Sequence, residues 1–380
     1  MAEFKDVDNR RKPTLALQAI RKELFMKSSV LKGLLFLCGS LMAFGVNVRT
    51  ISAQQQAQFT EAELREFTAL QPIDIHTHIL NSDAAFTAML KHFNLYVLDI
   101  FVGHVVGRGA STYTPETFVS HKQDSWQAVR SSGGRAKLST AFPRVGWGDP
   151  GFAQAAVSSI NDDFTQGAIG VSIWTNSVTQ FKDASGKFAL ACDPKLEPIY
   201  KDMIAHHIPL ISHTALLDET WVPDPTANSN GEPAALAARD HVLEQYPKLR
   251  VVAAHLGSYK EEMDKLTSRL ERYPNLAVDT AGRMDYLMGL PKEQARSFIL
   301  KFQDRILYGS DNAFNETDPV DGTLTRWQSH YVLDWRYLSG DGEVEYRGRQ
   351  VQCLNLPKAV LRKLYHDNAV HWVPGINAGS

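Results

Sequence analysis

Short apolar runs alternate with amphipathic stretches along most of the chain after residue 70. Several runs are rich in Val, Ile and Leu with little alternation, which is typical of strands buried on both faces of a parallel sheet. The eight predicted strands are residues 73–79, 94–101, 136–142, 168–174, 208–214, 250–256, 275–280 and 306–311. Apolar residues recur at helical spacing between them, as in 233–246 and 259–273.

The spacing of the strands indicates one repeating strand–helix unit. His255 and Asp311 lie 56 residues apart with one predicted strand between them, which gives 28 residues per unit. A strand, a loop and a helix need about this length. The repeat predicts an α/β fold, a distorted (β/α)₈ barrel of the TIM type. An open doubly wound sheet is the alternative, although no glycine-rich phosphate loop follows a strand to favour it.

Two segments at the C-terminal end depart from the repeat. Residues 318–356 follow the last predicted strand and indicate an insertion. Residues 357–373 have the pattern of a helix that closes the domain.

The N-terminal region has the layout of a secretory signal peptide. After Met26 come two lysines, an apolar stretch over 34–48 and small residues before Gln54. We expect an N-terminal extension and signal peptide over 1–53, and one barrel domain over 54–380. Translation is then expected to begin at Met26, and the mature protein is exported. An uncleaved membrane anchor that begins at Met1 is the alternative.

Composition and charge narrow the classes of function. The chain has 380 residues, 44% of them hydrophobic, and a formal net charge of -2, which suits a large globular core. There is no basic stripe for nucleic acid, so a small-molecule substrate is expected, and a homodimer stays open. Cys192 and Cys353 either pair in an oxidising compartment or remain free thiols.

The first strand carries the candidate chemistry in the run PIDIHTHIL, residues 72–80. Asp74, His76 and His78 occupy alternate positions, so a regular strand would place all three on one face. Two imidazoles on one face can reach a common point and bind one metal ion. A partly exposed strand that happens to carry histidines is the plainer alternative.

Other metal-binding side chains stand at the ends of later predicted strands. His213 closes the fifth strand, His255 closes the sixth and Asp311 closes the eighth. The C-terminal ends of barrel strands gather on one face, where active sites lie. The histidines of the first strand and these three residues are therefore predicted to converge.

These motifs resemble the amidohydrolase superfamily, in particular the branch that includes aminocarboxymuconate-semialdehyde decarboxylase. The likeness rests on IDIHTHIL, on the histidine after strand five, on AHLG after strand six and on YGSD of strand eight. It implies a distorted barrel with one divalent metal, usually zinc. It also implies that His76, His78, His213 and Asp311 are the ligands, with His255 as the catalytic acid and base. Three imidazoles and a carboxylate suit zinc, and Asp311 can share the proton transfer.

The fourth strand bears on the number of metal ions. Two-metal members of the superfamily bridge their ions with a carbamylated lysine or a glutamate from about this strand. Here Ser172 stands in the strand, and neither Lys nor Glu occurs from 168 to 180. A bridged two-metal site is therefore not expected.

Four residues are candidates for substrate binding. Trp174 and Asn176 follow strand four, and Trp221 begins a Pro- and Asn-rich loop, 221–233, that could cover the site. Arg283 is placed to hold a substrate carboxylate, although a surface salt bridge is equally compatible with its position. Asp74 either orients a metal ligand or is a structural acid.

Two enzymatic reactions fit these residues. The first is hydrolysis of an amide, ester or lactone by a metal-activated water. The alternative is non-oxidative decarboxylation of an unsaturated or aromatic carboxylic acid. A non-catalytic binding protein is a third class, but the complete set of ligands together with His255 argues against it.

Overall fold

A computed structural model of the protein describes residues 58–102, 114–143, 145–174, 189–214, 234–259 and 262–377. The predicted N-terminal extension and signal peptide, residues 1–53, lie outside these ranges and stay predictions. No helix within the described ranges combines the length and apolarity needed to span a bilayer. The described residues contain a single parallel sheet and a separate two-stranded hairpin.

From β1 to β8 the parallel sheet follows the chain order, and β9 lies on the other side of β1. This is the arrangement that repeated right-handed strand–helix units produce. Its strands are β1 (Ile73–Ile79), β2 (Tyr96–Ile100), β3 (Ala136–Thr140), β4 (Gly170–Trp174), β5 (Leu210–His213), β6 (Val251–Ala253), β7 (Leu276–Asp279), β8 (Ile306–Leu307) and β9 (Asn312–Phe314). β1 has its predicted bounds, β2 to β8 are shorter than predicted, and β9 follows the last predicted strand, 306–311, and was not predicted.

The run of chain over 306–314 closes the ring. β8 pairs with β7, whereas β9 pairs in parallel with β1. Between them, the Ile75 N–H donates to the Tyr308 carbonyl at 3.0 Å, and the Asp311 N–H donates to the His76 carbonyl at 2.9 Å. One interrupted run of chain thus joins the seventh strand to the first. The predicted TIM-type barrel is confirmed.

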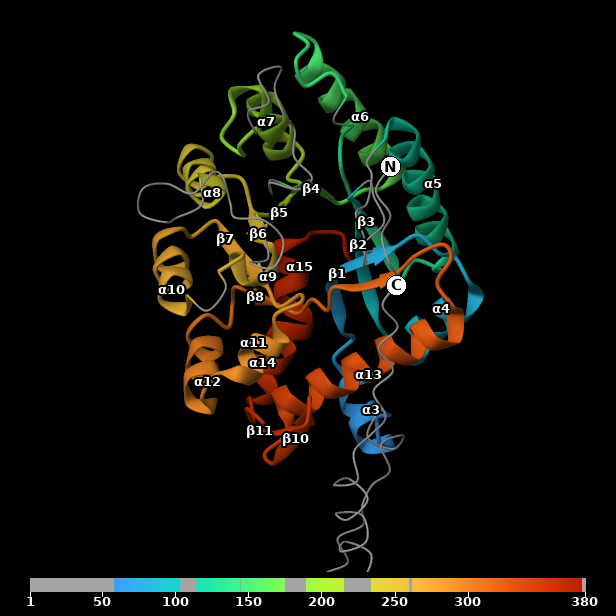
Figure 1. Cartoon of the computed structure of the whole chain (residues 1–380), viewed down its shortest axis with the longest axis vertical. Helices are drawn as coiled ribbons and strands as arrows, with labels where there is room; N and C mark the ends of the chain where they lie inside the picture. Colours follow the sequence, from blue (N-terminus) through green and yellow to red (C-terminus); the bar gives the residue numbers. More distant parts are fainter. Residues whose placement is uncertain are drawn as a thin grey trace, which may run out of the picture. The chain divides into compact units, whose positions relative to one another are not determined.

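Helices lie outside the strands (Figure 1). Local sequence explains some of these helices. Thr114 caps the helix that begins at Pro115. The helix over 263–272 buries the apolar face formed by Met263, Leu266 and Leu270. The helices up to the last barrel strand are α3 (Glu61–Ala69), α4 (Ala84–His92), α5 (Pro115–Ser131), α6 (Phe152–Gln166), η1 (Pro194–Leu196), α7 (Glu197–Ala205), α8 (Ala234–Gln245), α9 (Ala254–Gly257), α10 (Met263–Arg272), α11 (Met284–Gly289) and α12 (Lys292–Lys301).

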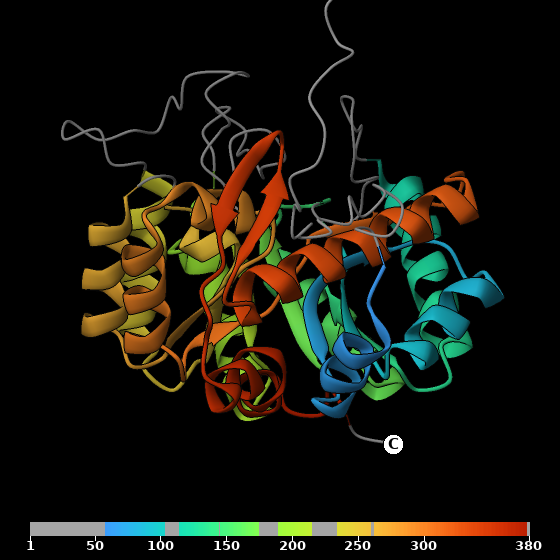
Figure 2. The ribbon, with the colours of Figure 1, turned by 90° about the horizontal axis from the view of Figure 1, so that it is seen from below.

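The predicted insertion is a long helix followed by a hairpin. Helix α13 (Val320–Ser339) leads into β10 (Glu343–Tyr346) and β11 (Arg349–Gln352), and Figure 2 shows the hairpin beside that helix. The predicted closing helix, 357–373, is confirmed over 358–372 and contains a π-helical turn. Its consecutive segments are α14 (Lys358–Arg362), the π-helical turn η2 (Lys363–Asp367) and α15 (Asn368–Trp372). The Leu364 carbonyl within that turn accepts the Tyr308 N–H, so the closing segment is bonded directly to the barrel strand.

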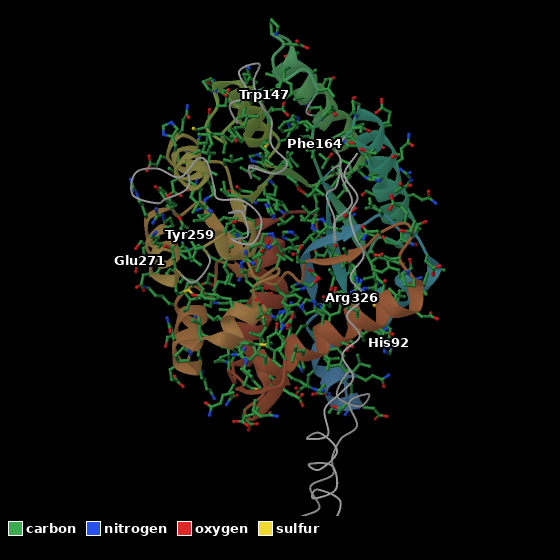
Figure 3. The ribbon with its side chains drawn as sticks, in the orientation of Figure 1. His92, Trp147, Phe164, Tyr259, Glu271 and Arg326 are labelled. Carbon is green, nitrogen blue, oxygen red and sulfur yellow. The ribbon has the colours of Figure 1, made fainter. Side chains whose placement is uncertain are left out.

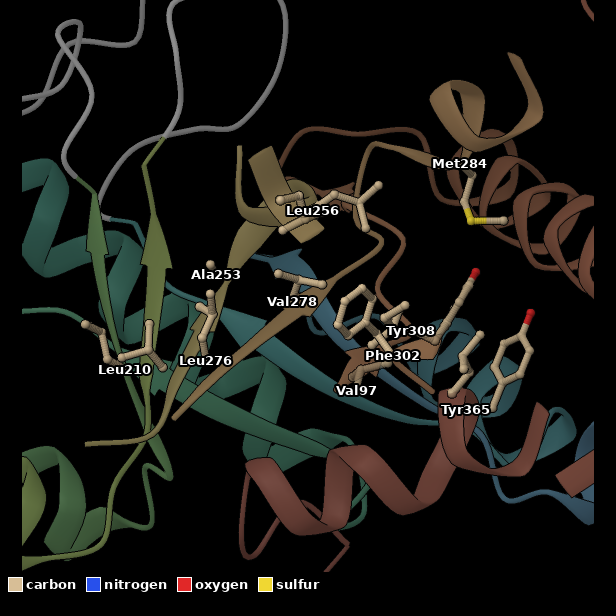
Figure 4. Close-up of a cluster of buried hydrophobic side chains, with 14 of the residues drawn as sticks. Val97, Leu210, Ala253, Leu256, Leu276, Val278, Met284, Phe302, Tyr308 and Tyr365 are labelled. Carbon is tan, nitrogen blue, oxygen red and sulfur yellow. The ribbon is translucent and has the colours of Figure 1, made fainter. Parts of the chain in front are cut away.

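Alternate residues of each strand divide the core into two layers. Ile75, Leu98, Ile211 and Val252 cluster with residues of α15 inside the barrel. Their neighbours pack outward against the helices (Figure 4), among them Val97, Leu210, Ala253, Leu276 and Val278. This alternation is the period of two expected for strands.

β1 breaks that alternation. Ile73 and Ile75 face the barrel interior, and Asp74 faces outward, where its carboxylate accepts the hydroxyl of Tyr331 from α13. The pairing of β1 with β2 then shifts between Asp74 and Thr77. A bulge of this kind turns the following side chains to the other face. The prediction that Asp74 shares one face with the two histidines is therefore wrong.

Candidate metal centre

Five side chains predicted from the sequence gather at the C-terminal ends of the strands. His76 and His78 belong to the end of β1, and His213 is the last residue of β5. His255 follows β6, and Asp311 lies between β8 and β9. The barrel brings these positions together because all of its strands run in one direction.

The distances define a compact group. Ligand atoms of His76, His255 and Asp311 lie within 4.8 Å of one another, close enough to hold one ion. The Asp311 Oδ1 is 3.6 Å from the His76 Nε2 and 3.3 Å from the Nε2 of His78. The ring centroid of His213 is 4.5 Å from that of His255. His76, His255 and Asp311 therefore form the compact group, with His78 beside Asp311 and His213 beside His255. The division between four ligands and one acid/base group stays a prediction.

Hydrogen bonds orient the imidazoles of His76, His78 and His255. The His76 Nδ1 lies 2.8 Å from Asp279 Oδ2. The His78 Nδ1 lies 2.8 Å from the Ile100 carbonyl oxygen, and the His255 Nδ1 lies 2.7 Å from that of Ala281. A carbonyl only accepts, so His78 and His255 carry a hydrogen on Nδ1. Their Nε2 atoms then offer a lone pair when the ring is neutral.

One buried atom tests whether a cation fits. His76 Nε2 has no hydrogen-bond partner among the described residues, although the ring is fully buried. A buried polar atom without a partner is costly, and a bound ion would remove that cost. Imidazole nitrogens and a carboxylate are the donor set of zinc and similar divalent ions. The residues present therefore fit a divalent metal.

The charges around the group agree with this fit. Burial would lower the pKa of His76, but the charge and hydrogen bond of Asp279 raise it to about 9. Burial would raise the pKa of Asp311, yet His255, His78 and His76 hold it well below its usual range. Burial also lowers the pKa of His213 and of His255. Without a metal, a proton on His76 balances the carboxylates, and metal binding would release that proton.

His255 stands in a strained backbone segment and not in the predicted strand. The strand ends at Ala253, and residues 255–258 have φ values of 59°, 52°, 67° and 63°. Such a left-handed turn costs about 1–2 kcal/mol for each residue other than glycine. The buried Arg239 supports it, since its Nη1 donates to the Gly257 carbonyl at 2.6 Å. The ring of Tyr259, which is labelled in Figure 3, lies against the same guanidinium. The Arg239 Cζ is 5.4 Å from the centroid of that ring.

Two glycines make room for the site. A Cβ on Gly309 would lie 2.9 Å from the Cβ of His76, and one on Gly282 would lie 3.0 Å from Asp311 Oδ2. Gly282 also has a positive φ of 57°, which favours glycine. The sequences YGSD and AGR thus place glycine where a side chain would displace a histidine or the aspartate.

The candidate substrate residues have different outcomes. Arg283 is half-buried, and its Nη1 donates to the carbonyl of the neighbouring Gly282 at 3.0 Å. Its buried Nε has no hydrogen-bond partner among the described residues, and, after burial, its charge contributes to the lowered pKa of His255. Trp174 ends β4, but its side chain lies outside the described part of the chain, as do Asn176, Trp221 and the predicted lid. These three residues stay predictions.

Other sequence expectations concern residues around the site. Ser172 is buried, and its Oγ lies 2.8 Å from Ser139 Oγ. Asp74 does touch the first strand, since it accepts the backbone N–H groups of His76 and Ser310. Cys192 and Cys353 are both free thiols.

Asp279 is the contact that the sequence reasoning missed. It is fully buried at the end of β7, and its two oxygens bond His76 Nδ1 and the His255 N–H. A signal was available, because Asp279 is the last residue but one of the predicted strand 275–280, close to the strand end where the other candidates lie. It was missed because no spacing linked it to a histidine.

Asp99 gives a prediction for the pH dependence of stability. It is buried in β2, and burial raises its pKa to about 7, against the opposing hydrogen bond from the Ile79 N–H. The folded state therefore holds a proton that the unfolded chain loses near pH 4, and stability falls as the pH rises from about 4 to about 7. We expect Asp99→Asn to be more stable than the parent at pH 8, by up to about 4 kcal/mol, and the difference to vanish near pH 4.

Urea unfolding at pH 4, 6 and 8 measures this difference. The exposed Asp341 supplies the control variant Asp341→Asn, for which a flat difference is expected. A difference for Asp99→Asn that is independent of pH would contradict the prediction.

The chain resembles a known protein family and several solved structures. A family model described as amidohydrolase matches residues 73–374. A search of curated proteins by sequence finds no match. The structure resembles 2,6-dihydroxybenzoate decarboxylase from Rhizobium, with a TM-score of 0.51, 12% identity, and coverage of 80% of this chain and 98% of that one.

Two further solved structures are similar. One is 2,6-dihydroxybenzoate decarboxylase with 2,6-dihydroxybenzoate bound, at a TM-score of 0.52 and 13% identity, covering 80% of this chain and 98% of that one. The other is a probable 2-pyrone-4,6-dicarboxylic acid hydrolase from Acinetobacter baumannii, at a TM-score of 0.47 and 12% identity. That match covers 80% of this chain and 99% of the hydrolase chain. At such low identity, the two decarboxylase matches bear on the fold alone. The family match spans most of the chain, and the chain belongs to the amidohydrolase family.

Proposed function

We propose that the protein is a metal-dependent hydrolase that cleaves an amide, ester or lactone bond in a small substrate bearing a carboxylate. The observation that carries this proposal is the group of imidazole nitrogens around the Asp311 carboxylate. Arg283 is near enough for its charge to act on His255, and its buried Nε has no hydrogen-bond partner among the described residues. An enzyme that uses water needs a metal or a base at this point, and the site offers residues that would hold a metal and an imidazole that can act as a base.

His76, His78, His213 and Asp311 are proposed to hold one zinc ion. The family resemblance assigns these four, and their donor atoms suit zinc. When bound, such an ion polarises a carbonyl oxygen and lowers the pKa of a coordinated water toward about 7. Hydrogen bonds at Nδ1 keep His76 and His78 turned so that Nε2 faces Asp311.

His255 is proposed to move the proton. Burial lowers its pKa, so the imidazole is neutral at pH 7. Its Nε2 then carries no hydrogen and can accept a proton from the attacking water. Its Nδ1 hydrogen bonds the Ala281 carbonyl, which fixes the ring while Nε2 later gives the proton to the leaving group. Asp311 can share the first transfer, since its carboxylate stays ionised.

A decarboxylase is the second candidate. The run IDIHTHIL favours it, because this motif resembles that of the decarboxylase branch. His255 would then protonate the carbon from which carbon dioxide leaves, and Arg283 would hold a carboxylate of the substrate. The two reactions use the same groups and differ in their products.

One experiment separates the candidates. The full chain is assayed twice, once loaded with zinc and once after the zinc has been removed with a chelator. The substrates are lactones, esters, amides and unsaturated or aromatic carboxylic acids. Acid release that requires zinc supports hydrolysis, and carbon dioxide release supports decarboxylation. Absence of both from a zinc-loaded protein would overturn the proposal.

Arg283 gives a prediction for substrate preference. An ion pair with the substrate carboxylate contributes about 1.5–3 kcal/mol, so we expect Arg283→Gln to lower kcat/KM for carboxylate-bearing substrates about 10–100-fold. Most of the change should be in KM, with little change for the matching methyl esters. Arg326→Gln, at an exposed arginine of α13, is the control. Equal losses for the acids and their methyl esters would argue that Arg283 does not bind the carboxylate.

A further inference from the structure

Asp279 touches both parts of the proposed centre. Its Oδ2 bonds the His76 Nδ1 at 2.8 Å, and its Oδ1 accepts the backbone N–H of His255 at 2.7 Å. The same Oδ1 accepts the Ala281 N–H at 3.1 Å. The Ala281 carbonyl in turn accepts the Nδ1 hydrogen of His255. One carboxylate thus connects the ring of a predicted ligand with the backbone and the ring support of the predicted acid/base residue.

We infer that Asp279 is a positioning residue that forces the Nδ1–H form of His76 and fixes the left-handed turn that carries His255. The inference rests on the metal centre of the proposed function. It goes beyond that function because it assigns the tautomer of a ligand to a residue on a different strand.

The hydrogen-bond roles make this assignment specific. An ionised carboxylate only accepts, so His76 must donate from Nδ1 and keep Nε2 for the metal. A carboxylate that accepts a ligand's ring N–H orients the ring and raises its basicity. The backbone N–H groups of His255 and Ala281 occupy the other oxygen, which leaves the group no freedom to rotate.

The charge of Asp279 also points to the centre. Asp279 is fully buried, and no lysine or arginine in the described part of the chain pairs with it. His76 is the partner with which it forms an ion pair there. A buried carboxylate that served only packing would be costly without a cation, whereas a metal on His76 would balance it.

The test is Asp279→Asn, which keeps the shape of the side chain. The amide oxygen can still accept the two backbone N–H groups, so its NH₂ group then faces His76 Nδ1. That arrangement makes Nδ1 an acceptor and moves the ring hydrogen to Nε2, the atom needed for the metal. We expect zinc affinity, measured by competition with a chromophoric chelator, to fall about 10–100-fold.

Asp74→Asn is the matched control. Asp74 is equally buried and accepts the backbone N–H of His76, but its other oxygen bonds the hydroxyls of Ser310 and Tyr331 and no imidazole. Hydroxyls can accept from the new NH₂ group, so this variant should keep its zinc affinity within about threefold. Equal losses of affinity in both variants would mean that Asp279 contributes only to packing, and the inference would fail.

Ring ¹⁵N spectra give a readout that packing alone does not move. The His76 signal is assigned by its loss in His76→Gln. Zinc-loaded parent protein should show hydrogen on Nδ1, and metal-free Asp279→Asn should show it on Nε2. A zinc-loaded parent with hydrogen on His76 Nε2 would overturn the inference even if the variant does not fold. A parent that binds no zinc would instead contradict the proposed function, so the two failures are distinguishable.

Discussion

Replacing His255 with asparagine is expected to lower kcat about 10²–10⁴-fold while one zinc per chain remains bound. The imidazole is the group proposed to accept the proton of the attacking water and return it to the leaving group. Asparagine cannot exchange a proton at pH 7, so the transition state loses this transfer. Its side-chain amide can still donate to the Ala281 carbonyl that now accepts the Nδ1 hydrogen of His255.

The compact group of ligand atoms makes this experiment decisive. His255 lies within 4.8 Å of the ligand atoms of His76 and Asp311, so its geometry also suits a ligand. Zinc content separates the two roles. Loss of zinc together with activity would assign His255 to the metal, and full activity would remove it from the proton transfer.

His366→Asn is the matched control for the same substitution. His366 is 7% exposed, as is His255, and its Nδ1 bonds a backbone carbonyl, that of Gln71, at 2.7 Å. It belongs to η2 in the closing segment and is far in sequence from the strand ends that form the centre. We expect it to lose some stability and to keep its zinc and its turnover. Thermal unfolding of both variants then shows how much of the effect at His255 is structural.

The barrel could be predicted because it depends on local patterns. The apolar runs that end at His78 and His213 are strands, and a parallel barrel brings their ends together by its geometry. The direction of Asp74 could not be predicted. A bulge in β1 depends on how that strand pairs with β2 and with the run 306–314, and no pattern within IDIHTHIL records it.

The conformation around His255 was also beyond the sequence. The run RVVAAHL has the composition of a strand, and a strand was predicted to continue through His255. The Asp279 carboxylate accepts the His255 N–H, and Arg239 supports the Gly257 carbonyl, so the chain leaves the sheet after Ala253. Both contacts come from other strand–helix units, and tertiary contacts of this kind override local propensity.

Replacing Asp311 with asparagine is expected to abolish stoichiometric zinc binding. Asp311 contributes the one carboxylate of the predicted ligand set, and His255, His78 and His76 hold it ionised. An amide oxygen is a weaker, uncharged donor. Loss of a residue that only orients a ligand already lowers metal affinity by about 10–100-fold, so we expect a loss of more than about 100-fold here.

Asparagine is the appropriate substitution because of the backbone. Asp311 has a φ of 65°, and asparagine tolerates this region better than most residues. Alanine would add strain and a gap beside Gly282, and the two effects could not be separated from loss of the ligand. The Asp311 N–H donates to the His76 carbonyl, and asparagine keeps that bond, so the closure of the barrel is preserved.

Thermal unfolding with and without zinc measures the consequence. A ligand at about 100 times its dissociation constant stabilises the folded state by about 2.7 kcal/mol, which should raise the melting temperature of the parent protein. Asp311→Asn should melt at the same temperature with and without zinc, whereas Asp264→Asn, at an exposed position of α10, should respond as the parent does. A zinc-dependent rise in Asp311→Asn equal to that of the parent would show that the imidazoles alone hold the ion. The carboxylate would then act on the proton rather than on the metal.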